Sequence, residues 1–105
     1  MSIVAGVLAE ELERQKANEN SYRGLLLKLP KGSLYCRQIR GHSYLYRVSR
    51  QGKNVHSIYI GPAGSPEADQ ARSDFKEYQR IRDNLKRCLA EQVRLCKALK
   101  PYEKQ

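Results

Sequence analysis

The sequence predicts an α+β fold in which a helical N-terminal segment, a three-stranded antiparallel β-meander and a long C-terminal helix follow one another. Three observations predict it. Apolar residues recur at helical spacing before Pro30, three runs rich in Tyr, Val, Ile and Leu lie between two turn signals, and no helix breaker interrupts the chain from Pro66 to about Leu99. Since 105 residues suffice for one modest core, we expect a single domain over residues 1–105.

Residues 1–29 are expected to be helical. Apolar side chains recur on both sides of a polar middle, at Val4, Leu8, Leu12, Tyr22, Leu25, Leu26 and Leu29. Asn18, Asn20 or Gly24 could interrupt the helix. The sequence is therefore compatible with one long helix and with two shorter ones. Pro30 ends the segment. The apolar run at residues 3–9 is too short for a signal peptide or a membrane span, so we expect no membrane partner.

Residues 32–60 are expected to form the three strands, with turns at residues 40–42 and 50–53. Two-residue loops at positions 41–42 and 51–52 would place Arg37 opposite Tyr46, and Tyr46 opposite Ser57. Side chains then separate into two faces, because successive strand residues point to opposite sides.

The two predicted faces differ in chemistry. One is rich in tyrosine and carries an arginine: Tyr35, Arg37, Ile39, Tyr44, Tyr46, Val48, Val55, Ser57 and Tyr59. The other holds the plain aliphatic residues and is the expected core face: Leu34, Cys36, Gln38, Leu45, Arg47, Ser49, His56, Ile58 and Ile60. Aromatic rings beside guanidinium groups suit stacking on bases and pairing with phosphates. A second helix that covers the tyrosines is the alternative.

Charge points to a polyanionic partner. The chain carries a formal net charge of +9, and no Asp or Glu interrupts its basic residues between positions 31 and 62. Such a patch attracts nucleic acid by electrostatics that salt weakens. We therefore expect nucleic-acid binding, with double-stranded DNA favoured over RNA and with the cations on phosphates. The expected contact residues are Lys31, Arg37, Arg40, Tyr44, Tyr46, Arg47, Arg50 and Lys53.

Residues 65–99 are expected to form the long helix, with Ser65 as N-cap and Pro66 at the first helical position. Its predicted apolar stripe is Ala71, Phe75, Tyr78, Ile81, Leu85, Leu89, Val93, Cys96 and Leu99. A helix of this length spans about 50 Å, which is longer than a three-stranded sheet is wide. Its distal half therefore needs the N-terminal helix as an antiparallel partner, or a second copy of the chain in a homodimer.

The sequence shows no catalytic or metal-binding pattern. It contains no nucleophile elbow, P-loop, paired-carboxylate motif or H-E-x-x-H, so we expect no enzyme activity and no cofactor. His42 and His56 lack ligand spacing, so we expect no metal. The three cysteines, Cys36, Cys88 and Cys96, form no C-x-x-C pair, which is typical of a reduced, cytoplasmic protein.

Several short motifs carry a resemblance. They are L-P-K-G-S-L at 29–34, R-x-I-x-G at 37–41, Y-L-Y-R at 44–47, R-x-G-K-x-V at 50–55 and Y-I-G-P at 59–62. With the charged helix that follows, residues 25 to about 95 resemble a family of small uncharacterised bacterial and phage proteins. The topology is also similar to the arm-type DNA-binding domain of tyrosine recombinases, whose sheet enters the major groove, although that domain lacks the N-terminal helical segment and has a shorter C-terminal helix.

The two resemblances imply different functions. The recombinase similarity implies a sheet that binds double-stranded DNA. A phage-type protein implies instead an interaction protein that inhibits or adapts a host nucleoprotein, such as a CRISPR effector nuclease.

Overall fold

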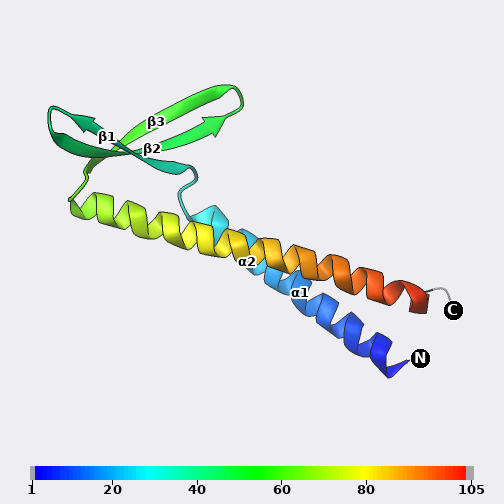
Figure 1. Ribbon diagram of the computed structural model, residues 1–105. Helices are drawn as coiled ribbons and strands as arrows, with labels where there is room; N and C mark the ends of the chain where they lie inside the picture. Colours follow the sequence, from blue (N-terminus) through cyan, green and yellow to red (C-terminus); the bar gives the residue numbers. More distant parts are fainter. Residues whose placement is uncertain (1, 104–105) are drawn as a thin grey trace. The chain divides into compact units, whose positions relative to one another are not determined.

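The computed structural model describes residues 2–103, and Met1, Lys104 and Gln105 lie outside the described residues. Its elements are α1 (Ile3–Lys28), β1 (Ser33–Ile39), β2 (His42–Gln51), β3 (Asn54–Pro62) and α2 (Pro66–Glu103) (Figure 1). The predicted α+β class and the order of its elements are confirmed. The chain divides into two compact units, one made of residues up to 28 and from 80 onward, the other of residues 29–79.

The N-terminal segment is one helix, which resolves the alternative that the sequence left open. Gly24 lies inside α1 without ending it. The propensity cost of an interior glycine is only about 1 kcal/mol, which packing and side-chain pairs along the helix outweigh. Two such pairs join Glu11 to Arg14 at 2.6 Å and Glu19 to Arg23 at 2.7 Å.

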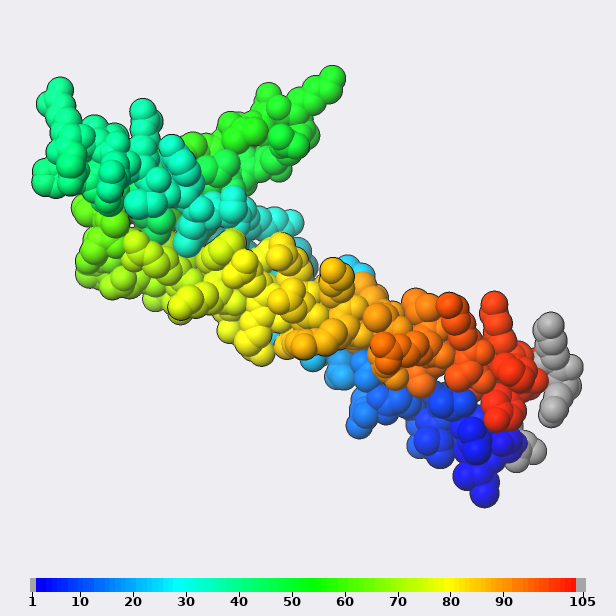
Figure 2. All heavy atoms as spheres, in the orientation of Figure 1, coloured from blue at the N-terminus to red at the C-terminus, as the bar shows by residue number. Residues whose placement is uncertain are grey.

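The distal half of α2 pairs with α1 in an antiparallel arrangement. The Cys88 Sγ donates to the Gln15 carbonyl at 3.0 Å, and Gln92 Nε2 donates to Glu19 Oε1 at 2.9 Å. Ala5 near the start of α1 lines a hollow with Leu99 near the end of α2, and the space-filling view shows these two ends in contact (Figure 2). The N-terminal helix is thus a partner of the distal half of α2.

The buried stripe of this helix pair differs from the predicted one. Ile81, Leu85, Cys88 and Leu95 are buried, whereas Leu89, Val93 and Cys96, predicted on the same stripe, are exposed. Two paired helices bury a seam that repeats every seven residues in steps of three and four. The predicted stripe instead takes two consecutive steps of four residues, from Leu85 to Leu89 and on to Val93. At about 100° per residue, these steps place the Val93 side chain about 80° around the helix axis from Leu85, away from the seam.

The second unit contains the antiparallel sheet, in the order β1-β2-β3. Its register differs from the predicted one: Arg37 lies opposite Tyr44, and Tyr46 lies between Tyr35 and Tyr59. Both predicted pairings, of Arg37 with Tyr46 and of Tyr46 with Ser57, are therefore wrong.

Turn chemistry explains the difference. The first turn centres on Arg40 and Gly41, with φ of 51° and 81°, as a type I′ turn requires; the second has Gly52, with φ of 63°, at its first central position. Each loop lies one residue away from its predicted place, so each opposing residue moves by two positions. A shift of two leaves every side chain on its predicted face.

The core of this unit lies where the start of α2 meets the sheet. Leu45 is 3% exposed and packs with Ala68 and Ala71 of α2, and Leu34 and Ile60 pack against this cluster. The helix begins as predicted, because Ser65 Oγ accepts a hydrogen bond from the Ala68 N–H at 3.2 Å.

Several residues of the expected core face are not in the core, since Cys36, Gln38, His56 and Ile58 are exposed. Ile58 is 58% exposed, although it shares a face with Leu45. It pairs with Arg47, on the side of Leu45 that leads to the β2–β3 turn, and it takes no part in the cluster around Ala68 and Ala71. A β-bulge opposite Leu45 and Tyr46 leaves Ile60 out of the strand pairing, and Ile60 packs against the core.

Candidate nucleic-acid interface

Four tyrosines form a continuous cluster on one face of the sheet, which we call the tyrosine face. Tyr35, Tyr46 and Tyr59 lie directly opposite one another on the three strands. Ring centroids are 6.2 Å apart for Tyr35 and Tyr46, and 5.4 Å apart for Tyr46 and Tyr59. Tyr44 adds a fourth ring at 6.1 Å from Tyr59. These tilted and edge-to-face contacts are the arrangements that aromatic quadrupoles favour, so the rings support one another.

The tyrosine face is open within residues 29–79. Ala68 and Ala71 of α2 pack on the opposite face, against Leu45, so the helix of this unit does not cover the tyrosines. Tyr35 is 50% exposed and Tyr59 is 53% exposed. The alternative of a covering helix is therefore not realised by any element of this unit.

Two arginines share the tyrosine face. Arg37 lies opposite Tyr44, and Arg50 lies opposite Val55 at the far end of β2. By strand alternation both side chains lie on the same face as Tyr46, one on each side of the row of three rings. The sequence assigned Arg50 to a turn; recognition of Gly52 and Lys53 as the loop would have placed it in the strand.

The other three predicted cations outside the strands lie at the edges of the sheet. Arg40 is at the β1–β2 turn, Lys53 is at the β2–β3 turn and Lys31 precedes β1, and all three are exposed. Arg40 has φ of 51°, a left-handed conformation that costs a residue with a side chain about 1–2 kcal/mol.

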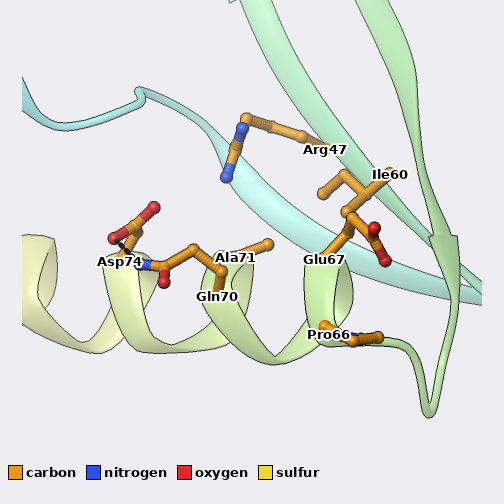
Figure 3. Close-up of a pocket in the computed structure, with 7 residues that line it drawn as sticks. All are labelled: Arg47, Ile60, Pro66, Glu67, Gln70, Ala71 and Asp74. Carbon is orange, nitrogen blue, oxygen red and sulfur yellow. Dashed lines mark hydrogen bonds between the residues drawn. The ribbon is translucent and has the colours of Figure 1, made fainter.

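Arg47 lies apart from the other predicted contact residues. It belongs to the core face and lines an open hollow with Glu67, Gln70 and Asp74 of α2 (Figure 3). Gln70 Nε2 donates to Asp74 Oδ1 at 2.9 Å on the floor of this hollow. Arg47 thus shares its hollow with two acidic residues of the helix, although the Glu67 carboxylate points away from the guanidinium (Figure 3). Arg37 and Arg50 lie instead on the tyrosine face.

Residues 2–103 contain three cysteines but no cluster of metal-binding side chains. No group of three or more His, Cys, Asp or Glu side chains in this range is placed to hold a metal ion. Neither helix described there has the length and apolar character needed to cross a membrane. Cys36 and Cys96 are exposed free thiols and Cys88 is a buried one.

Comparison with known proteins identifies a matching family model. The model of a family described as Domain of unknown function (DUF6788) matches residues 7–70, which is more than half of the chain. The matched range includes all three strands, both turns and the start of α2. No curated protein and no solved structure matches the chain. The match supports a resemblance to an uncharacterised family and nothing more specific. No comparison supports the similarity to the recombinase arm domain.

Proposed function

The chain belongs to this family of unknown function, and we propose that it binds nucleic acid through the tyrosine face and the two turns of its sheet. One observation carries the proposal: half-exposed tyrosines share an open face with Arg37 and Arg50. No carboxylate lies between positions 31 and 62 to oppose an anionic ligand.

The chemistry of the face matches a phosphate backbone with bases. Guanidinium groups pair with phosphate oxygens through two parallel hydrogen bonds, a role for Arg37 and Arg50. Arg40, Lys53 and Lys31 extend the positive surface around the sheet, which strengthens binding without reading sequence. Tyr44 and Tyr46 lie beside these contacts. Phosphate contacts of this kind can be made with double-stranded DNA, which the sequence favours, and equally with single strands.

The test is gel retardation with labelled DNA, duplex and single-stranded, for the unaltered protein and the double variant Arg37→Ala/Arg50→Ala. Each lost phosphate contact should reduce the slope of log affinity against log salt by about 0.9 on duplex or about 0.7 on single strands. Lys97→Ala is the matched control, because Lys97 is an exposed cation of α2 outside residues 29–79. Equal losses in the two variants, or no retardation at low salt, would refute the proposal.

A second candidate is a protein partner, in the manner of an adaptor or inhibitor of a host nucleoprotein. The observation in its favour is that Ile39 and Val55, on the tyrosine face, are 39% and 58% exposed, and apolar side chains of this kind suit a protein surface. Capture of one protein from nuclease-treated host lysate, lost in Val55→Ser, would support it.

A further inference from the structure

We infer that the tyrosine face takes unpaired nucleotides, in single-stranded DNA or RNA, in preference to a duplex. This inference rests on the proposed nucleic-acid binding and specifies its ligand. It departs from the double-stranded DNA that the sequence alone favours, because the arrangement of the rings was not visible in the sequence.

Three tyrosine rings lie in one row across the three strands. Tyr46, on the central strand, packs against both neighbours, with interplanar angles of 45° to Tyr35 and 60° to Tyr59. The two outer rings are thereby held in place, and each is half-exposed. Tyr46 supports the outer rings, and Tyr35 and Tyr59 present their free surfaces to a ligand.

The spacing of the two outer rings differs from the spacing of stacked bases. Neighbouring strands lie about 4.8 Å apart, so Tyr35 and Tyr59 stand on positions about 10 Å apart. Stacked bases of one strand in a duplex lie only about 3.4 Å apart, and their faces are covered by their neighbours. Unpaired bases can be splayed out and stacked singly on aromatic side chains. The outer rings therefore suit one splayed base each.

Positive charges flank the row of rings. Arg37 and Arg50 lie on the same face, on either side of the tyrosine row. A strand that lays its bases on the rings then has guanidinium groups within reach of its backbone, as in proteins that bind single strands through aromatic platforms in basic grooves. Because every base has a π-face that can stack on a tyrosine ring, we expect weak preference among bases.

A duplex makes poorer use of this face. It offers phosphates and groove edges but no free base faces, so Tyr35 and Tyr59 would contribute little beyond their hydroxyl groups. Duplex binding would then depend on the cations alone.

The test uses tyrosine fluorescence, since the chain has seven tyrosines and no tryptophan. The probes are a single-stranded DNA, the same sequence as RNA, its duplex and an abasic strand of equal length that supplies phosphates only. We expect the two single strands to quench emission and to bind about tenfold or more tightly than the duplex and the abasic strand. The ratio of DNA to RNA affinity then identifies the source of the unpaired bases.

Tyr35→Leu and Tyr59→Leu remove a ring but keep apolar contact with Tyr46. Each should lower affinity for single strands by about 5- to 150-fold and leave the abasic strand unaffected. The matched controls Tyr35→Phe and Tyr59→Phe keep the ring and should retain affinity. Duplex binding as tight as single-strand binding, without quenching, would overturn this inference and leave the proposed function standing. Binding of none of the four probes would overturn both.

Discussion

Tyr46 and Tyr59 lie directly opposite each other on β2 and β3, and their rings meet edge to face with centroids 5.4 Å apart. Leu45, the residue before Tyr46, points to the other side of the sheet and is 3% exposed. Two adjacent residues thus mark a tyrosine face and a core face, and variants on the two faces should behave differently.

Leu45→Ala should lower the free energy of unfolding by about 2–4 kcal/mol, because it leaves a cavity against Ala68 and Ala71. Arg37→Ala, on the exposed face, should change it by no more than about 0.5 kcal/mol. Urea unfolding followed by circular dichroism would measure both. A larger loss of stability in Arg37→Ala than in Leu45→Ala would invert the assignment of the two faces.

Arg40→Asn should stabilise the protein by about 1 kcal/mol, because Asn followed by Gly is the preferred pair in a type I′ turn. The same change should weaken nucleic-acid binding by removing a cation from the turn. Lys53→Asn is the matched control: it removes a cation from the other turn but relieves no positive φ, so binding should fall without a gain in stability. Thermal melts and gel retardation on both variants test this trade between stability and binding.

Gly32→Ala should destabilise the sheet by about 1–3 kcal/mol. Gly32 has φ of 112°, and a Cβ there would lie 2.4 Å from the Val48 carbonyl oxygen of the neighbouring strand. Gly24→Ala is the control, and its effect on stability should have the opposite sign. A Cβ at Gly24 meets nothing within 4 Å, so alanine should stabilise α1 by about 0.8–1 kcal/mol. If both variants shift the melting temperature in the same direction, one of these two backbone environments is wrong.

The sequence predicted the faces of the sheet better than its register. The face on which a strand residue lies depends only on whether its distance along the strand is odd or even. A shift of the register by two positions does not change this assignment. The register depends on which residues adopt positive φ, and the first turn uses Arg40 for this role. Arginine is a rare choice there, so turn propensities favoured a loop that begins at Gly41. Local sequence patterns also predicted the order of the elements, the N-cap at Ser65 and the tyrosine face.

Two features depended on tertiary packing and were beyond local patterns. Leu89 and Val93 fit an apolar stripe, but the seam with α1 passes instead through Cys88 and Gln92. Gln92 is polar, so no hydrophobic pattern would select it. The hollow that Arg47 shares with Glu67 and Asp74 forms only once α2 packs against the sheet.

The helix pair should lose stability in acid, through Glu19. Hydrogen bonds from Gln92 and then Arg23 hold the pKa of Glu19 below its ordinary value of 4.5. A carboxyl whose pKa is lower in the folded state contributes stability that is complete above its unfolded pKa and is lost as pH falls through the folded pKa. Glu11 has its pKa lowered in the same direction by Arg14 and Gln15. We therefore expect melting temperatures to fall as pH drops below 4.5.

Gln92→Leu separates the contribution of Glu19 from general acid effects. It removes the hydrogen bond that lowers the pKa of Glu19 most, and it keeps a side chain of similar size in the seam, so the pKa of Glu19 should rise toward its ordinary value. The difference in melting temperature between neutral pH and about pH 3 should then be smaller in this variant than in the unaltered protein. Glu13→Gln is the control, because Glu13 is exposed and its carboxylate pairs with Lys16 of the same helix at 3.6 Å. An acid response that is unchanged in Gln92→Leu would show that the bond between Gln92 and Glu19 does not stabilise the helix pair in solution.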